Sequence, residues 1–443
     1  MLVAAALLFL KGAAFAVDPS FAVTPDHPDG VYKPNETVTW TVDVKGDRSG
    51  LTALPYKVKL DGQNVVTSGT IDVSATSAKI SATRPDPGAL LMQISSMDKT
   101  KPLPVGMGGA VFAPDKITPV APAPKDFDDF WQAKIKELDA VPANPKVEPL
   151  DISALKNSAG MEASKITLDN IAGAHAHGIL VKPSKPGKYP AILMVNFAGV
   201  YPLDKPAIIA QAMPGWIALN ISAHDLPVDE SDAYYKDLKE NAYKNYYYFG
   251  SEDRETTYFL HMILGCVRGA EYLTSLPDWD GKTLIVTGMS QGGLQSFATA
   301  ALYPKFSAVL TAVPAGCDAL GPLANPPHAI SWPYWMSPFG TKGRDVKKSQ
   351  ITGTYYDTTY FAQRIHCPAL VAVALLDEAA RPAGVFAAYN SITTPKELVI
   401  MPISTHYGNN GGLGLYMARF MKWKQALQKG LPIPAPSPTP GGS

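Results

Sequence analysis

The fold is decided by one stretch, Thr283-Leu284-Ile285-Val286-Thr287-Gly288-Met289-Ser290-Gln291-Gly292-Gly293. A β-branched strand pattern leads into a G-x-S-x-G turn, and a helical pattern follows the turn. In a nucleophile elbow the serine holds a strained backbone conformation, and small residues two positions to either side let strand and helix approach closely. Gly288 and Gly292 meet that condition, so the stretch predicts a nucleophilic serine, Ser290. A glycine-rich turn without chemistry is the alternative.

Strands and helices alternate along the chain on both sides of this stretch. The predicted strands span residues 191–197, 216–221, 283–287, 308–313, 369–375 and 397–401. The predicted helices span residues 126–138, 206–213, 258–275, 292–301, 383–392 and 414–427. This rhythm predicts an α/β fold class with a mostly parallel sheet, over residues 125–430.

A second, smaller unit is predicted at the N-terminal side. Residues 17–112 contain short runs that alternate with period two, such as 38–42 and 56–60, with turn signals at Asp61-Gly62 and Ser68-Gly69. This spacing is typical of a small all-β domain, an Ig-like sandwich. Residues 113–124 are Pro-rich and predict a stiff linker, and residues 431–443 predict a low-complexity tail.

Composition and charge limit the classes of function that the chain can have. The 443 residues are 46% hydrophobic and carry 39 basic and 39 acidic side chains, which indicates a globular protein without the electrostatic footprint of nucleic-acid or membrane binding. Residues 1–16 predict a signal peptide, with an apolar run at Leu2–Leu10 and cleavage after Ala14-Phe15-Ala16. We therefore expect a secreted protein, extracellular or periplasmic, with an uncharged partner.

The three cysteines do not indicate thiol chemistry or a metal site. Cys266, Cys317 and Cys367 stand in no C-x-x-C or metal-ligand spacing, and three cysteines cannot all pair within one chain. Buried free thiols are the expectation, with a Cys317–Cys367 disulfide left open.

A serine nucleophile needs a general base and an acid that orients the base. Where the chain order is serine, acid, histidine, His406 fits the base because it follows the last strand, whereas His328 precedes the acid strand and His366 enters that strand from the opposite end. Asp377 fits the acid as the first carboxylate after the strand at 369–375. Glu378 is the alternative, and Asp318 and Asp357 are weaker candidates because neither follows a strand so directly.

Acyl transfer also needs N–H donors directed at the developing oxyanion. The backbone N–H of Gln291 supplies the first donor. The second is predicted in the turn after residues 191–197, from either Val200 or Tyr201.

Other polar and aromatic residues are weaker candidates. His175 and His177 lie on one face of a strand, but with no third ligand evident we expect a hydrogen-bonded surface pair and no metal. His224 follows the strand at 216–221 and is a tentative substrate-site residue. Trp332 and Trp335, with Tyr334, either contact a sugar substrate or pack in a lid.

Together these residues resemble the acetyl xylan esterases and cephalosporin C deacetylases of carbohydrate esterase family seven, which have the α/β-hydrolase fold. The resemblance covers about residues 126–424. It rests on Asp126-Phe127-Asp128-Asp129-Phe130-Trp131, Gly288-Met289-Ser290-Gln291-Gly292-Gly293, Val313-Pro314 with Cys317-Asp318, and Leu376-Asp377 with Ala388-Tyr389-Asn390. It implies deacetylation of acetylated xylan, xylo-oligosaccharides or related small sugars, without a cofactor, by Ser290, Asp377 and His406.

The chain departs from the family pattern at two places. His224-Asp225-Leu226 stands where the family usually has Arg-Gly-Gln, and Tyr407 follows His406 where the family usually has a glutamate. The resemblance also allows a homo-oligomer, since family members tend to form ring-like hexamers. Two alternatives stay open: an esterase for another carbohydrate or short-chain acyl ester, and a non-catalytic glycan-binding protein.

Overall fold

The computed structural model describes residues 20–46, 53–96, 105–213, 215–325, 327–328, 331–335 and 343–436. The expected signal peptide lies outside these ranges, as does the expected tail from residue 437 onward. Among the described helices, none combines the length and the apolar character that crossing a membrane requires.

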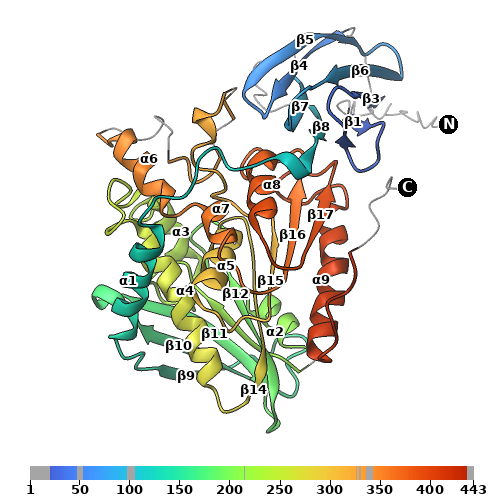
Figure 1. The fold of residues 1–443 in the computed structure, drawn as a ribbon. Coiled ribbons are helices and arrows are strands. Elements are labelled where there is room, and N and C mark those ends of the chain that lie inside the picture. Colours follow the sequence, from blue (N-terminus) through green and yellow to red (C-terminus); the bar gives the residue numbers. More distant parts are fainter. Residues whose placement is uncertain are drawn as a thin grey trace, which may run out of the picture.

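Two β-sheets form the N-terminal part of the described chain (Figure 1). Their strand orders are β1-β3-β6 and β2-β8-β7-β4-β5. Side chains along β3 alternate between buried and more exposed positions, and the buried set packs with the other sheet around Trp40, Met92 and Phe112. The prediction of a small all-β region is confirmed. The bounds are β1 Ser20–Pro25, β2 Val31–Tyr32, β3 Thr37–Lys45, β4 Ala53–Leu60, β5 Asn64–Asp72, β6 Ser77–Thr83, β7 Gly88–Ile94 and β8 Gly106–Phe112.

The turn predicted at Ser68-Gly69 is wrong, because both residues lie inside β5. Gly69 stands opposite Tyr56 on β4, and a Cβ atom at Gly69 would lie 2.9 Å from the Tyr56 ring. The glycine therefore leaves room for a cross-strand aromatic ring and does not form a turn.

A nine-stranded sheet forms the centre of the rest of the chain, in the order β17-β16-β15-β14-β12-β13-β11-β10-β9. Strands β12 to β17 run parallel to one another, while β9, β10 and β11 extend one edge in antiparallel register. The predicted α/β class with a mostly parallel sheet is confirmed. The bounds are β9 Lys146–Leu150, β10 Met161–Asp169, β11 His175–Pro183, β12 Tyr189–Val195, β13 Ile217–Ile221, β14 Trp279–Met289, β15 Ala308–Ala312, β16 Ala369–Ala374 and β17 Lys396–Met401.

Helices cover this sheet (Figure 1). Helices α4 and α5 pack against each other and against the central strands, and α9 is joined to α2 by Lys424, whose Nζ donates to the carbonyl of Gln211 at 2.6 Å. The helix bounds are α1 Phe127–Asp139, α2 Lys205–Ala212, α3 Asp232–Glu240, α4 Tyr258–Ser275, α5 Gln291–Leu302, α6 Val346–Thr354, α7 Thr358–Ala362, α8 Pro382–Ser391 and α9 Gly412–Gln428, with short 3₁₀ turns η1 Pro114–Lys116, η2 Ile171–Gly173, η3 Tyr246–Tyr248 and η4 Gly321–Leu323.

The segment predicted as a linker, residues 113–124, lies against the α/β part of the molecule. The side-chain amide of Asn390 donates to the carbonyl of Ile117 at 2.8 Å, and Asp318 accepts the backbone N–H of Val120 at 3.1 Å. The hydroxyl of Tyr360 donates to the carbonyl of Ala121 at 3.1 Å. The segment, which contains the 3₁₀ turn η1, is therefore held along its length against the α/β part.

The β region sits at the carboxyl end of β16 (Figure 1). A Cβ at Gly109 of β8 would lie 2.6 Å from the Cβ of Leu375, so the two backbones are in close contact. Gln93 of β7 donates to Glu378 at 2.9 Å. The N-terminal region therefore touches the loop that carries the predicted catalytic acid.

The three cysteines, Cys266, Cys317 and Cys367, are free and buried. The disulfide between Cys317 and Cys367 that the sequence left open is not formed. Burial raises the pKa of Cys367 to about 12, so its thiol is uncharged and unreactive at neutral pH.

Candidate active site

Ser290 occupies a sharp turn between β14 and α5. Its backbone has φ 60° and ψ −119°, a conformation that L residues rarely adopt. A Cβ at Gly288 would lie 2.4 Å from the carbonyl oxygen of Gly292, and one at Gly292 would lie 2.7 Å from the carbonyl oxygen of Val195. Both positions therefore require glycine, as the elbow pattern predicts.

Three side chains from three separate loops meet at this turn. His406 Nε2 lies 2.8 Å from Ser290 Oγ, and His406 Nδ1 lies 2.7 Å from Asp377 Oδ2. The other carboxylate oxygen, Asp377 Oδ1, accepts the backbone N–H groups of Ala379 and Ala380, both at 2.8 Å. Asp377 is 1% exposed, so these bonds fix a buried carboxylate in one orientation beside the imidazole.

The alternative residues for these positions lie elsewhere. Glu378 turns toward the β region and accepts from Gln93. His328 lies 3.8 Å from both Asp61 and Asp318, and His366 is exposed ahead of β16. Of the candidates weighed from the sequence, the structure brings together Ser290, His406 and Asp377.

The predicted oxyanion donors lie on two segments that are tied to each other. Gln291 begins α5, where a backbone N–H has no partner within its own helix. Its side-chain oxygen accepts the hydroxyl of Tyr246 at 2.7 Å, and the same hydroxyl oxygen accepts the backbone N–H of Gly199 at 3.1 Å. The elbow and the turn that carries Val200 and Tyr201 are therefore held by one tyrosine.

His224 supports the same turn from the other side. Its Nε2 lies 2.8 Å from the carbonyl oxygen of Gly199, and its Nδ1 lies 3.0 Å from the hydroxyl of Tyr258. Burial lowers the pKa of His224 to about 4. The ring is therefore neutral at pH 7, and since a carbonyl only accepts, its proton sits on Nε2. The sequence predicted His224 as a substrate-site residue. No local sequence pattern indicated that it contacts Gly199 and Tyr258, or that Tyr246 contacts Gly199.

In the aromatic insertion between Ser290 and Asp377, Trp332 and Trp335 are buried, whereas Tyr334 is only partly buried. Trp335 is 3% exposed and packs against Phe259 and Tyr356, which matches the lid-packing alternative. Trp332 is also buried, and its backbone N–H bonds to the carbonyl of Ala379 beside the acid loop. Tyr334 is half-buried, and burial raises the pKa of its hydroxyl.

Two large aromatic side chains are exposed on the loops that follow β12 and β17. Tyr407, the neighbour of His406, is 82% exposed. Phe197 is 54% exposed and stacks on Tyr201 with ring centroids 4.7 Å apart. Both rings are therefore open to solvent, and sequence periodicity gave no sign of either.

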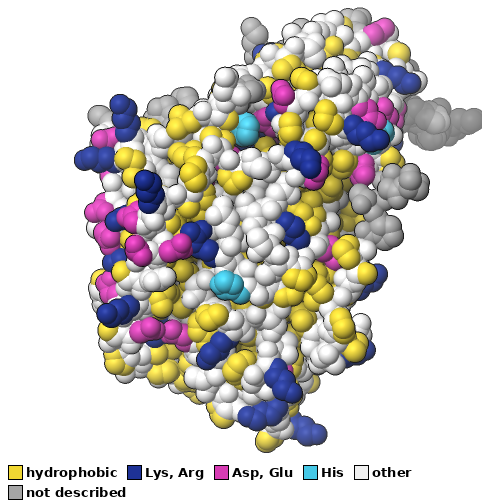
Figure 2. All heavy atoms as spheres, in the orientation of Figure 1, with side chains coloured by type: hydrophobic (Ala, Val, Ile, Leu, Met, Phe, Trp, Pro, Cys, Tyr) yellow, Lys and Arg dark blue, Asp and Glu magenta, His cyan; other side chains and the backbone are white. Residues whose placement is uncertain are grey.

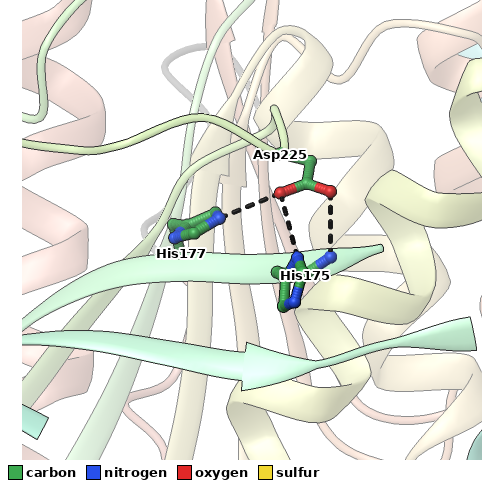
Figure 3. Close-up of side chains that lie close together, drawn as sticks. All are labelled: His175, His177 and Asp225. Carbon is green, nitrogen blue, oxygen red and sulfur yellow. Dashed lines mark hydrogen bonds and ion pairs between the residues drawn. The ribbon is translucent and has the colours of Figure 1, made fainter. Parts of the chain in front are cut away.

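One group within the described ranges could hold a metal, namely His175, His177 and Asp225 (Figure 3). The sequence suggested the two histidines without a third ligand, and the fold adds Asp225 from the loop after β13. Burial opposes the charge on Asp225, but hydrogen bonds from His177 and from the His175 backbone outweigh it and lower the pKa of the carboxyl.

The chain is similar in sequence to proteins of one known family. Residues 115–427 match the family model described as acetyl xylan esterase (AXE1). The acetyl esterase Axe7A of Xylanibacter ruminicola is 32% identical over 404 residues, which cover 89% of this chain and 88% of that protein.

Solved structures share the fold. The acetyl xylan esterase 1 of Thermoanaerobacterium sp. JW/SL YS485 has a TM-score of 0.58 at 23% identity, covering 69% of this chain and 96% of its own. The acetyl xylan esterase of Paenibacillus sp. R4 has a TM-score of 0.57 at 22% identity, covering 69% and 98%. The central sheet with its helices is thus an α/β-hydrolase fold. On the family match and the identity to its relative, the chain belongs to the acetyl xylan esterase family and is a carboxylic ester hydrolase.

Proposed function

We propose that this protein is an exported serine esterase that removes acetyl groups from acetylated xylan, xylo-oligosaccharides or related small sugars through an acyl-enzyme. The observation that carries the proposal is the hydrogen-bonded line Ser290–His406–Asp377, with distances of 2.8 and 2.7 Å. Family membership supports acetyl esters as the substrate class.

The proposed mechanism assigns one task to each residue. Ser290 Oγ attacks the acetyl carbonyl carbon while His406 Nε2 takes the hydroxyl proton, and Asp377 stabilises the imidazolium that results. The oxyanion accepts hydrogen bonds from the N–H of Gln291 and from that of Val200 or Tyr201, each donor being worth about 3–4 kcal/mol in the transition state. The imidazolium then protonates the departing sugar oxygen, and water attacks the acetyl-serine in a second cycle that releases acetate.

An uncharged sugar substrate suits the balanced charge of the molecule. Basic and acidic side chains are interspersed on the face drawn in Figure 2, and the formal net charge is +0. The exposed rings of Phe197 and Tyr407 offer apolar faces on which a sugar ring can stack. Export is part of the proposal because of the signal-peptide pattern at residues 1–16.

Acetate release from acetylated xylo-oligosaccharides tests the proposal. We expect turnover by the full chain and a loss of about 10⁴-fold or more in kcat for Ser290→Ala. Ser184→Ala, an exposed serine, is the matched control and should keep full activity. Unchanged turnover by Ser290→Ala would rule out the mechanism.

The same experiment separates the alternatives. Cleavage of short nitrophenyl esters without acetate release from any acetylated sugar would favour an esterase for another acyl substrate. Glycan binding without hydrolysis of either substrate would favour a non-catalytic glycan-binding protein.

A further inference from the structure

Two histidines and one aspartate converge at the start of β11, beside the loop that follows β13 (Figure 3). His175 and His177 are two residues apart on β11, so their side chains point to the same face of the strand. Asp225 lies in the loop after β13, the strand that pairs with β11. The ligand atoms of all three residues lie within 4.8 Å of one another.

Both imidazole rings face the same carboxylate oxygen. His177 Nε2 lies 2.9 Å from Asp225 Oδ1, and His175 Nδ1 lies 3.6 Å from it. The second oxygen, Asp225 Oδ2, accepts the backbone N–H of His175 at 3.0 Å, which fixes the carboxylate plane relative to β11. The side chains of His175 and Asp225 are 38% and 41% exposed, so an ion can enter from solvent.

In each histidine, the ring nitrogen that does not face Asp225 also has a partner. Both partners come from the neighbouring strand β10. Thr167 stands opposite His177 in the strand register and its Oγ1 lies 3.1 Å from His177 Nδ1. Asp169 stands opposite His175 and its Oδ1 lies 3.8 Å from His175 Nε2. Metal-binding histidines usually have such an outer partner, which selects the tautomer and orients the ring.

We propose that His175 Nδ1, His177 Nε2 and an oxygen of Asp225 form a binding site for a zinc-class divalent metal ion. Two imidazoles and one carboxylate suit zinc, whereas calcium and magnesium prefer oxygen ligands. Zinc bonds of about 2.0–2.2 Å place tetrahedral ligand atoms roughly 3.3 Å apart. The present separations reach that spacing by small side-chain rotations, with the His177–Asp225 hydrogen bond replaced by two metal bonds. Water completes the coordination.

The site has a structural role. Strand β11 is separated from β14, the strand of Ser290, by β13 and β12, so the ion lies outside the proposed proton relay. Asp225 follows His224, whose Nε2 donates to the carbonyl of Gly199. A metal that fixes Asp225 against β11 therefore also fixes the loop that supports the turn of Val200 and Tyr201. This last step rests on the proposed function, whereas metal binding itself does not.

The test is metal binding by the full chain after removal of bound metals with a chelator. Isothermal titration with Zn²⁺ at neutral pH is expected to show one equivalent bound, and Co²⁺ is expected to give the visible absorption of a four- or five-coordinate site. Mg²⁺ is expected to bind much more weakly. Asp225→Asn and His177→Ala, each checked for folding by circular dichroism, should weaken Zn²⁺ binding by about 10-fold or more.

His366→Ala is the matched control, because His366 is an exposed histidine outside the cluster. It should bind Zn²⁺ like the unmodified protein. The proposal is overturned if the unmodified protein binds no Zn²⁺, or if the two folded cluster variants bind as tightly as the control. If the two cluster variants lose metal binding but keep full esterase activity, the metal site is supported. Only its proposed effect on the turn of Val200 and Tyr201 would then be wrong.

Discussion

At the residue scale, the hydrogen bond between Asp377 and His406 sets which nitrogen of the imidazole faces Ser290. Asp377 Oδ2 accepts from Nδ1, so Nε2 is left free to take the proton of Ser290. Asn at position 377 can keep the bonds from Ala379 and Ala380 through its oxygen, but its NH₂ group then faces Nδ1. The imidazole would be held in the wrong tautomer.

Asp377→Asn is therefore expected to lower kcat by about 10⁴-fold without unfolding the protein. Steady-state acetate release together with the thermal midpoint checks both parts. Glu378→Gln is the control, since the neighbouring carboxylate bonds Gln93 and not His406. Equal losses of kcat in the two variants would contradict the proposed role of Asp377 in orienting His406.

The convergence of Ser290, His406 and Asp377 could be predicted from the sequence, because each residue follows a recognisable strand in the order that a triad needs. Ser290 also carries a local glycine signature that steric contact enforces. Tyr246 and Asp225 could not be found in the same way, because their partners Gly199 and His177 lie 47 and 48 residues away and no local pattern marks either contact.

At the element scale, the junction of β14 and α5 depends on two glycines that leave no space for a side chain. A Cβ at Gly288 would be 2.4 Å from the backbone oxygen of Gly292, and backbone atoms cannot rotate away as a side chain can. Strand and helix would have to separate, which would also move Ser290.

Gly288→Ala is expected to destabilise the protein by roughly 2–4 kcal/mol and to reduce kcat/KM sharply, since it combines steric overlap with displacement of the serine. Gly414→Ala is the matched control: it lies within α9 with nothing within 4 Å of the added Cβ, so the same change should stabilise by up to about 1 kcal/mol. Chemical denaturation of both variants measures the difference. A Gly288→Ala protein as stable and active as the original would contradict the close approach.

Elements were predictable where the hydrophobic period was regular. The helix predicted over 258–275 has those bounds in α4, and the strand predicted over 308–313 differs from β15 by one residue. The prediction of a turn at Ser68-Gly69 was wrong because Gly69 leaves room for the ring of Tyr56 on the neighbouring strand. Only the register of β4 and β5 reveals that contact.

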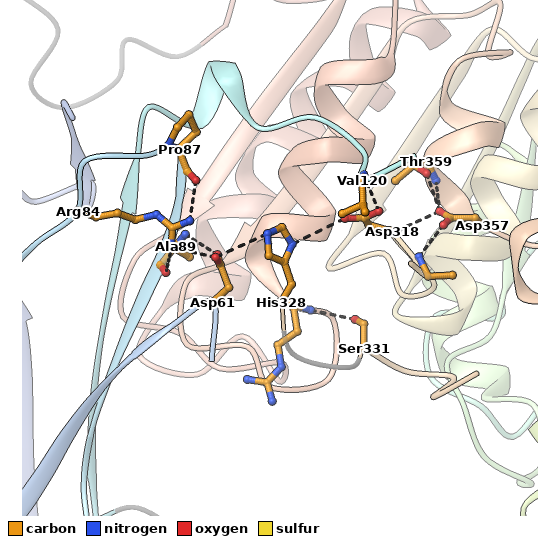
Figure 4. A network of polar contacts seen from close by, with 12 residues as sticks. Asp61, Arg84, Pro87, Ala89, Val120, Asp318, His328, Ser331, Asp357 and Thr359 are labelled. Carbon is orange, nitrogen blue, oxygen red and sulfur yellow. Dashed lines mark hydrogen bonds and ion pairs between the residues drawn. The ribbon is translucent and has the colours of Figure 1, made fainter. Parts of the chain in front are cut away.

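At the scale of the whole molecule, buried and half-buried titratable side chains lie where the linker segment, the β region and the α/β part meet (Figure 4). Asp318 accepts from Val120, and its Oδ2 lies 3.8 Å from His328, which in turn lies 3.8 Å from Asp61 of the β region. Burial and the nearby charge of Asp357 raise the pKa of Asp318 to about 7.

This shift predicts how stability depends on pH. The unfolded carboxyl has a pKa near 3.8, so between about pH 4 and pH 7 the folded state binds more protons, and stability is lost as the pH rises through that window. Across this window, Asp318 lowers the free energy of unfolding by an amount of order 4 kcal/mol. Asn at this position is neutral throughout, and it tolerates the left-handed backbone (φ 54°) found there.

Asp318→Asn is thus expected to raise the thermal midpoint at pH 8 and to lose most of that advantage at pH 5. Asp86→Asn, an exposed aspartate in the β region, should change neither value appreciably. A stability gain for Asp318→Asn that is the same at both pH values would contradict the raised pKa.

The arrangement of the two regions was beyond prediction from the sequence. Composition separated an all-β part from an α/β part, but the contact of Gly109 with Leu375, two residues before Asp377, depends on the shapes of two folded surfaces. The same holds for the docked linker, whose Pro-rich composition says only that it is extended.

Ser290 is expected to carry the acyl group during turnover. Rapid acid quenching of the protein with nitrophenyl acetate, followed by mass spectrometry of its peptides, tests this directly. We expect one acetyl group on the peptide that contains Ser290, with none on that peptide in Ser290→Ala. Turnover at the normal rate with no acetylated Ser290 at any quench time would contradict the account.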